Sequence, residues 1–338
     1  MRKTRFFGMA AAILALTASM ACSQSKQKAA VAESEAVDSV FVKPLRVEGT
    51  ALLNTDGDTV VLTGASFGWH GNWGRFYTPG SVKAIKEKWG ANVTRAAIGA
   101  HTSGDVLNSY EADSAYAVNS AIAVIDAAIA NDMYVICDWH SHENRKENAK
   151  KFFEVISKKY GDDPHIIYEI WNEPLQIQWQ EIKDYAAEVI PVIRKNAPNS
   201  VVIVGTPSWD QEVDKAAADP LKEKNVTYAL HYYAATHKDY LRERARQAID
   251  AGLPLFISEC GSMEATGDGP IDYESWNAWV DLADRNKLSM LMWSISDKVE
   301  TCSMLEPGAP SDGMQWTDDN LKEWARLVKE TTQTRNSK

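Results

Sequence analysis

From Phe41 onwards, short apolar runs alternate with longer segments whose apolar residues recur at helical spacing. The runs have the length of buried β-strands, and Ala115–Ala130 shows a clear 3.6-residue recurrence. The apolar runs are Val60–Leu62, Val93–Ile98, Met133–Cys137, Ile166–Trp171, Val201–Val204, Tyr228–Leu230, Leu255–Ile257 and Met290–Trp293. The helix candidates between them are Ser81–Trp89, Ala115–Asn131, Asn148–Tyr160, Trp179–Asn196 and Tyr273–Arg285.

Eight strand candidates, roughly 25–40 residues apart and each followed by a helical pattern, predict a (β/α)8 (TIM) barrel. An open, doubly wound sheet is the alternative, but such folds often carry a phosphate-binding glycine loop, and this sequence has none. A β-hairpin is expected before the barrel, with strands over Leu45–Leu53 and Thr59–Ala65 and a turn at Asn54–Asp58. The sequence therefore predicts one barrel domain over residues 41–338, opened by a short hairpin.

Polar and aromatic residues follow six of the eight strand candidates, at the point where each apolar run ends. In a barrel the carboxyl ends of the strands converge on one mouth, where active sites are built. Each residue alone has an ordinary structural explanation, such as a buried salt bridge or a core histidine, but all six sets together predict a site. They are Arg95; Asp138, Trp139 and His140; Asn172 and Glu173; His231 and Tyr233; Glu259; and Trp293.

Two of these residues, Glu173 and Glu259, are carboxylic acids at the ends of different strands. Retaining hydrolysis of a glycosidic bond needs one carboxylic acid to protonate the leaving oxygen and one carboxylate to attack the sugar. We expect Arg95 and the Tyr233 hydroxyl to keep Glu259 ionised as the nucleophile. Glu173, expected to lie further from that cation, is then the acid/base.

The other strand-end residues suit the binding of a sugar. Asn172 is placed to hydrogen-bond the sugar 2-hydroxyl, an interaction that strengthens in the transition state. His140 and His231 would orient hydroxyls or the carboxylates, and Trp293 would form a floor under the ring. The 12 Trp and 12 Tyr residues are mostly explained by core packing, but flat aromatic faces also suit sugar rings.

Four motifs around these residues resemble glycoside hydrolase family 5, most closely its bacterial endo-β-1,4-glucanases. They are Ile-Tyr-Glu-Ile-Trp-Asn-Glu-Pro at 167–174, Asp-Trp-His at 138–140, His-Tyr-Tyr-Ala at 231–234 and Ser-Glu-Cys-Gly at 258–261. The resemblance implies a β/α barrel, retention of anomeric configuration, Glu173 as acid/base and Glu259 as nucleophile. It also implies that Lys298 and Glu300, in the loop after the last strand, contact sugars on the non-reducing side.

Further residues are expected to line a substrate cleft. His70 and Trp73, with their neighbour Trp69, follow the first strand candidate, and we also expect Trp209 to contact substrate. The chain departs from the family after the nucleophile, where Cys260 stands at a position that is often aromatic. Cys137 and Cys260 lie in or beside strands, so we expect both to be buried structural cysteines.

Charge and composition narrow the range of partners. The formal net charge of the 338 residues is -10 and 45% of them are hydrophobic, which suits a globular enzyme with a sizeable core. An acidic chain without basic clusters is a poor candidate for binding nucleic acid or an anionic membrane surface. No His, Cys and Asp cluster has metal-ligand spacing, so we expect neither a metal nor a cofactor, and we expect a monomer.

The first residues have the pattern of an export signal. A positively charged start, Arg2–Arg5, precedes the apolar stretch Phe6–Ala18, which is too short to span a bilayer. Small residues before Cys22 resemble a bacterial lipoprotein signal, in which Cys22 would carry the lipid. We expect a signal peptide over residues 1–21 and a flexible tether over residues 22–40. The protein would be anchored by lipid in the cell envelope, at the periplasm or the cell surface; ordinary secretion is the alternative.

The leading interpretation is a retaining endo-β-1,4-glucanase that cuts internal bonds of cellulose-type β-glucans by double displacement. A related β-mannanase or xyloglucanase is the alternative within the same chemistry, because the shape of the subsites decides between these substrates. A non-catalytic glycan-binding lipoprotein is a further alternative. The presence of Glu173 and Glu259 together with Arg95 and Asn172 argues against it.

Overall fold

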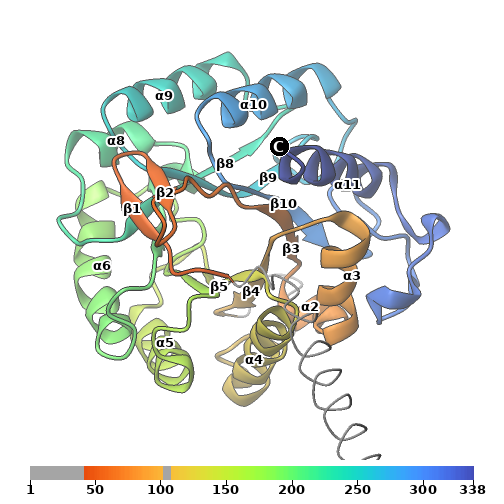
Figure 1. The fold of residues 1–338 in the computed structure, drawn as a ribbon, viewed down its shortest axis with the longest axis horizontal. Helices are drawn as coiled ribbons and strands as arrows, with labels where there is room; N and C mark the ends of the chain where they lie inside the picture. Colours follow the sequence, from red (N-terminus) through yellow and green to blue (C-terminus); the bar gives the residue numbers. More distant parts are fainter. Residues whose placement is uncertain (1–41, 102–107) are drawn as a thin grey trace, which may run out of the picture. The chain divides into compact units, whose positions relative to one another are not determined.

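The computed structural model describes residues 42–101 and 108–338, and these form a closed barrel of parallel strands inside a ring of helices (Figure 1). The strands follow one another around the barrel in chain order, and β10 closes it by pairing with β3. The prediction of a (β/α)8 barrel is confirmed. The strands are β3 (Thr63–Phe67), β4 (Val93–Gly99), β5 (Tyr134–His140), β6 (Ile166–Glu169), β7 (Val202–Val204), β8 (Val226–Tyr233), β9 (Leu255–Gly261) and β10 (Met290–Ile295).

The five predicted helices are present, and their ends lie within about two residues of the predicted ones. Local signals fix several ends: the Thr78 side chain accepts a hydrogen bond from the Ser81 amide, and Gly90 takes a left-handed conformation after the last turn. The helices of the ring are α3 (Pro79–Trp89), α4 (Ser114–Ala130), α5 (Lys146–Tyr160), α6 (Trp179–Arg194), α8 (Val213–Ala218), α9 (Asp239–Asp250), α10 (Tyr273–Arg285) and α11 (Glu323–Asn336). Shorter helical turns are α2 (His70–Trp73), α7 (Pro207–Asp210), η1 (Gly74–Phe76), η2 (Gly313–Gln315) and η3 (Asp318–Asn320).

The first barrel strand is not where the sequence predicts it. Val60–Leu62 precedes the strand, and β3 is formed by the next five residues, Thr63–Phe67, which are all buried. This segment contains Gly64, where a Cβ atom would lie 1.9 Å from the Val93 carbonyl oxygen. The close approach of two strands therefore selects small residues there, and small residues give a weak hydrophobic signal.

An N-terminal hairpin is present, but both of its strands lie within Leu45–Leu53, the segment predicted as its first strand, and the predicted second strand, Thr59–Ala65, runs into β3 instead. The chain turns at Gly49, so that β1 (Arg46–Glu48) pairs antiparallel with β2 (Ala51–Leu53). The predicted turn at Asn54–Asp58 does form, with the Asn54 amide donating to the Asp58 carbonyl at 3.0 Å. Only a single bridge, between Leu53 and Thr59, continues the pairing beyond it among the described residues.

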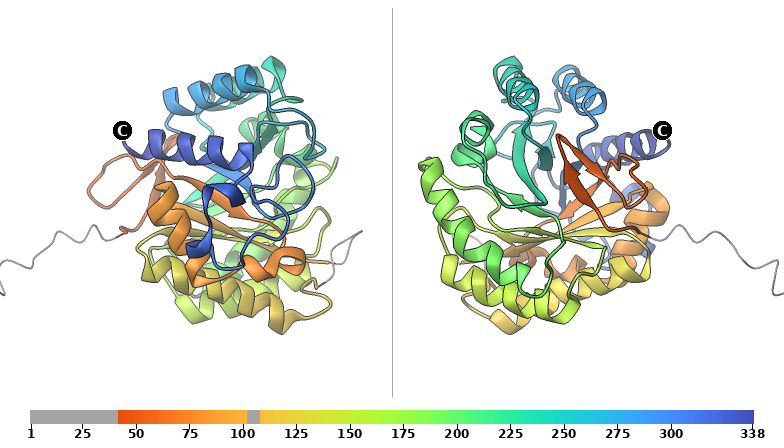
Figure 2. Two further views of the ribbon diagram at one scale, coloured as in Figure 1. Left: turned by 90° about the vertical axis from the view of Figure 1, so that its right-hand side faces the viewer. Right: turned by 60° about the vertical axis from the view of Figure 1, so that its left-hand side comes forward.

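The hairpin closes one end of the barrel, inside the outline of the helix ring (Figures 1 and 2). Leu45 lies just before the hairpin and Leu52 lies in its second strand. Both pack against inward-facing side chains at the start of the barrel strands. We call this cluster the barrel floor: Leu45, Leu52, Leu62, Val93, Tyr134, Ile136, Ile167, Val201, Ile203, Ala229, Phe256 and Leu291. It is a separate cluster from the larger core between strands and helices.

The predicted signal peptide (1–21) and tether (22–40) lie outside the described residues. Within the described ranges, no helix combines the length and the apolar character that a membrane span requires.

Candidate active site

A cleft lies at the carboxyl ends of the barrel strands and consists of two adjoining cavities of about 450 Å³ and about 250 Å³. The larger cavity is lined by Trp69, His140, His142, Glu173, Trp209, Gln211, His231, Tyr233, His237, Glu259, Ala265 and Trp293. The smaller one is lined by Trp69, Asn72, Trp73, Tyr233, Ala265, Thr266, Gly267, Trp293, Ser294, Lys298, Glu300 and Cys302. The shared residues, among them Trp69 and Trp293, make the two cavities one continuous cleft.

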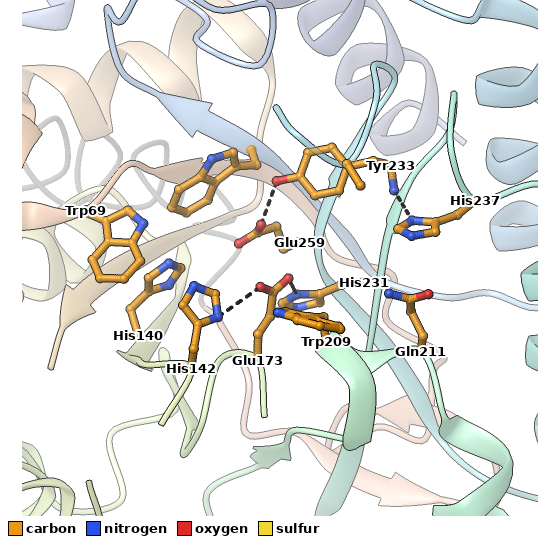
Figure 3. Close-up of a pocket in the computed structure, with 12 residues that line it drawn as sticks. Trp69, His140, His142, Glu173, Trp209, Gln211, His231, Tyr233, His237 and Glu259 are labelled. Atoms are coloured by element: carbon orange, nitrogen blue, oxygen red, sulfur yellow. Dashed lines mark hydrogen bonds and ion pairs between the residues drawn. The ribbon is translucent and has the colours of Figure 1, made fainter. Parts of the chain in front are cut away.

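The carboxylates of Glu173 and Glu259 face each other in the larger cavity (Figure 3). An oxygen of one lies within 4.8 Å of an oxygen of the other. In retaining glycosidases the two carboxyl groups are about 5–5.5 Å apart, whereas inverting enzymes keep them about 6.5–9.5 Å apart to admit a water molecule. The approach seen here fits direct attack by one carboxylate on a sugar.

Glu259 is held from two sides. Its Oε1 accepts a hydrogen bond from the Tyr233 hydroxyl at 2.8 Å, and its Oε2 lies 3.2 Å from Arg95 Nη1. Arg95 is fully buried and also pairs with Glu169 at 2.7 Å and Asp138 at 2.9 Å. Burial alone would lower the pKa of Arg95, but these three acids raise it, so Arg95 remains a cation. Because Arg95 lines neither cavity, it can act on Glu259 rather than on the substrate.

Two histidines lie beside Glu173. His231 Nδ1 lies 2.9 Å from its Oε1, and His142 Nδ1 lies 3.5 Å from its Oε2. Burial is the largest single effect and works to raise the pKa of Glu173, but the hydrogen bond and charge of His231, with smaller contributions from His142 and Arg95, together lower it. For Glu259, burial and the negative charge of Glu173 raise the pKa.

These opposite directions reverse the order expected of an acid/base and a nucleophile, and the pair can resolve the conflict with a single proton. Two carboxylates this close disfavour being ionised together, so the pair titrates as a unit. A proton on Glu173 removes the negative charge that opposes ionisation of Glu259. Arg95 and the Tyr233 hydroxyl then stabilise the Glu259 anion. The state in which Glu173 is acid and Glu259 is nucleophile is therefore favoured by the contacts of Glu259.

Asn172 is oriented by Arg95 beneath the cavity. Its Oδ1 accepts a hydrogen bond from Arg95 Nη2, and the side chain is almost completely buried. Its Nδ2 finds no partner among the described residues. A buried amide normally satisfies such a donor, and Asn172 borders neither cavity, so its NH2 group is unsatisfied among the described residues.

Aromatic rings form one wall of the cleft. The rings of Trp293 and His140 stack with their centroids 5.0 Å apart, and Trp69 meets His140 edge-on at 4.4 Å. Burial and the nearby Arg95 lower the pKa of His140, whose Nδ1 lies 2.7 Å from Asp138, so a neutral imidazole is favoured. On the other side of the carboxylates, Trp209 is 37% exposed and faces the cavity (Figure 3).

Lys298 and Glu300 lie in the smaller cavity with Trp73. The Lys298 ammonium pairs with Glu300 at 2.7 Å, and Lys322 donates hydrogen bonds to the backbone carbonyls of both residues. The loop is thus held at both positions, and it presents one charged pair beside an aromatic ring, which is an arrangement suited to a sugar.

The structure does not bring every predicted residue to the surface of the cleft. His70 is fully buried, its Nδ1 accepts a hydrogen bond from the Gly99 amide at 2.9 Å, and it lines neither cavity. Cys137 and Cys260 are buried as expected; with Cys302, they are unpaired in the described part of the chain.

The sequence analysis missed several residues of the site. His142 could have been found, because it follows the strand end at His140 by two residues. Glu169 could also have been found, since an acid inside an apolar strand must be paired. Asp210 ends the helical turn α7, Gln211 follows it, and His237 lies in the loop after β8; no sequence pattern marks these three residues.

Comparisons with known proteins agree with this geometry. A family model described as Cellulase (glycosyl hydrolase family 5) matches residues 53–299. The chain is 40% identical over 299 residues to Endoglucanase Z of Dickeya dadantii, covering 87% of this chain and 67% of that protein. It is 41% identical over 285 residues to Endoglucanase A of Evansella cellulosilytica, covering 81% of this chain and 56% of that protein.

Solved structures give the same result. The catalytic domain of Thermobifida fusca endoglucanase Cel5A superposes with a TM-score of 0.81 at 32% identity, covering 86% of this chain and 98% of that one. A variant of the same domain in complex with cellotetraose gives a TM-score of 0.81 at 31% identity, with the same coverage. The residues matched by the family model include all eight barrel strands and both carboxylates that face each other. The chain therefore belongs to glycoside hydrolase family 5.

Proposed function

We propose that this protein is a retaining endo-β-1,4-glucanase acting on cellulose-type β-glucans. The close approach of Glu173 and Glu259 carries the proposal, because it leaves no room for the water that an inverting enzyme needs. The chain spans 67% and 56% of the length of the two curated relatives named above, and both of those proteins are endoglucanases.

The reaction proceeds in two displacements. Glu259 attacks C1 of the sugar, the bond from C1 to the leaving oxygen breaks, and Glu173 gives its proton to that oxygen. The product of this step is a glycosyl ester on Glu259. Water then attacks C1 while Glu173 takes its proton, and the ester bond breaks to restore the Glu259 carboxylate. Two inversions at C1 give net retention.

The substrate preference follows from the sugar 2-hydroxyl. Asn172 has a free, buried NH2 group to offer to this hydroxyl, which is equatorial in glucose and axial in mannose. A mannose ring would leave the donor unpaired, and such a loss costs about 1–3 kcal/mol, or roughly ten- to a hundredfold in rate. The cellotetraose complex of the similar Thermobifida fusca domain supports a β-1,4-glucan.

Export and lipid attachment at Cys22 are part of the proposal. They are supported by the charged start, the short apolar stretch and the small residues before Cys22. A single acyl chain binds a membrane only marginally, so stable anchoring requires two or more chains on this residue.

Two measurements test the catalytic proposal. Proton NMR of the first-formed product of a cello-oligosaccharide should show the β-anomer, and an α-anomer would refute the roles given to the two acids. Reducing-sugar assays on carboxymethylcellulose, mannan and xyloglucan should show the highest specificity constant on the glucan and a value at least tenfold lower on mannan. Comparable values on mannan and carboxymethylcellulose would refute the glucan preference.

A further inference from the structure

A left-handed turn after β7 carries an acid into the site from outside the strand ends. Ser208, Trp209 and Asp210, the last residues of α7, have φ angles of 58°, 55° and 60°. Three consecutive non-glycine residues in this region are unusual, because the left-handed conformation crowds the Cβ atom. Strain of this kind is maintained where the surrounding structure demands it, often at functional sites. The turn has one clear result: Trp209 faces the cleft, while Asp210 is fully buried.

The buried Asp210 carboxylate points at the histidine that bonds Glu173. Its Oδ1 accepts a hydrogen bond from the Thr206 amide. Its Oδ2 lies 3.3 Å from His231 Nδ1 and has no hydrogen-bond partner of good geometry among the described residues. The same Nδ1 atom lies 2.9 Å from Glu173 Oε1. One imidazole nitrogen therefore faces two carboxylates, of which only Glu173 borders the cleft.

Other charged groups face this arrangement from neighbouring strands. Around His231 lie Glu169 on β6 at 3.8 Å from Nε2, with Asp138, Glu259 and Arg95 further away on β5, β9 and β4. Ser258 Oγ, at 2.9 Å, is a neutral partner of Nε2. Around Glu173 lie His142 and, more distantly, His237. Burial acts to lower the pKa of His231, but Asp210, followed by Glu169 and Glu173, raises it well above its usual range.

We propose that Asp210 is a positioning residue that acts as the counter-ion of His231 and thereby sets the upper pH limit at which Glu173 still holds the proton for the leaving group. The inference rests on the proposed function. Without a negative partner, the charge of His231 would bear fully on Glu173 and drive off its proton. Burial raises the pKa of Asp210, and the positive charge of His231 at 3.3 Å works against that rise, so the two groups are charged as a pair. The paired imidazolium and carboxylate are together close to neutral, and Glu173 can then serve as an acid.

The sign of the effect can be worked out from the charges. Asp210 is a negative neighbour of both His231 and Glu173, so it makes both groups hold their protons more tightly. Removing its charge makes both lose their protons at lower pH. The alkaline limb of kcat/KM reports the loss of the essential acid in the free enzyme. This limb should therefore move to lower pH by about one unit or more, the usual effect of a charge at this distance.

The test compares Asp210→Asn with Asp214→Asn. Asparagine preserves the shape of Asp210 and can still accept the Thr206 hydrogen bond. Asp214, on α8, is the matched control, because it loses the same charge from a side chain that is 42% exposed and paired with Arg244 at 3.3 Å. The pH dependence of kcat/KM is measured on a cello-oligosaccharide with a poor leaving group and on a dinitrophenyl cellobioside, which needs no protonation.

The expected result is an alkaline limb shifted to lower pH in Asp210→Asn on the first substrate only, with the control unchanged. KM should change little, because Trp209 is held by its own amide, which donates to the Pro174 carbonyl at 2.8 Å. Asp210→Ser, which also removes the charge and can also accept from Thr206, should give the same shift and serves if the asparagine variant does not fold.

A readout independent of catalysis separates this inference from the proposed function. In protein labelled with ¹⁵N-histidine, the His231 imidazole should titrate at lower pH in Asp210→Asn than in the natural protein. Reduced activity with an unmoved alkaline limb and an unmoved His231 titration would overturn the proposal, because a purely structural role predicts that outcome. If the wild-type protein had no glucanase activity but His231 still titrated at lower pH in Asp210→Asn, the proposed function alone would be refuted.

Discussion

Arg95 donates a hydrogen bond to Asn172 through Nη2 and forms an ion pair with Glu259 through Nη1. One buried guanidinium thus orients both the group that would bind the 2-hydroxyl and the group that would attack C1. Because Asn172 Nδ2 has no partner among the described residues, the proposed bond to the 2-hydroxyl can be tested by substitution.

Asn172→Ala should lower kcat/KM on cello-oligosaccharides by roughly a hundredfold or more, because hydrogen bonds to the 2-hydroxyl supply several kcal/mol in the transition state. The measurement is a comparison of natural and 2-deoxy substrates. On a 2-deoxyglucoside the variant and the natural enzyme should differ far less. An equal loss on both substrates would mean that Asn172 acts only through the structure of the site.

The two catalytic acids should fail differently when they are removed. Glu259→Ala should lose nearly all activity, and external azide should restore it with a glycosyl azide of opposite configuration as the product. Glu173→Ala should keep the first step on substrates with good leaving groups, which need no protonation. Azide would then accelerate its second step and give a product of the original configuration. If the two variants exchange these behaviours, the roles of acid and nucleophile are reversed.

Lys298→Ala should weaken glucan binding, seen as a higher KM, and leave the pH profile of kcat/KM unmoved. Lys298 is paired with Glu300 in the smaller cavity, away from the carboxylates that transfer protons. Lys83→Ala, which removes a similarly exposed lysine on α3, is the control and should change neither quantity. A shift in the pH profile of Lys298→Ala would contradict a role in positioning.

Leu52→Ala should destabilise the protein by about 2–4 kcal/mol, since it opens a cavity in the barrel floor. Thermal unfolding should begin several degrees lower, with kcat at 25 °C close to that of the natural enzyme. Leu53→Ala, on the less buried face of the same strand, is the control and should cost less. Equal losses of unfolding free energy in the two variants would show that packing in the barrel floor adds no stability beyond that of the other face of the strand.

Cys22→Ser should release the protein from the membrane fraction of the producing cells into a soluble one. The substitution removes the only thiol that the signal-like segment offers to a lipid. Fractionation followed by immunoblotting is the measurement. A variant that remains with the membrane would refute lipid attachment at Cys22.

The strand-end rule recovered most of the site from the sequence. Glu173, Glu259, His140 and Trp293 were found because apolar runs of ordinary length end next to them, and the barrel brings those ends together. Asp210 could not be found in this way. Its position depends on three left-handed residues, and the residues Ser208 and Trp209 give no indication of that backbone.

Two other features were not predicted from the sequence. The first barrel strand was predicted too early in the chain, because β3 begins with small and polar residues and no larger side chain fits at Gly64. The histidines beside Glu173 were not assigned to it, because the expectation considered only its distance from Arg95, which pairs with Glu259.

The barrel floor and the charged groups around Arg95 occupy opposite halves of one interior, and this separation bears on how the enzyme can be altered. Within the described ranges, the floor residues make no hydrogen bond or ion pair with Glu173 or Glu259. Changes at sites without shared partners usually add in their free energies. A variant selected for heat tolerance through a repacked floor should therefore accept substitutions at Trp73, Trp209 or Lys298 without renewed optimisation, so that durability and substrate range can be engineered in separate libraries and combined at the end.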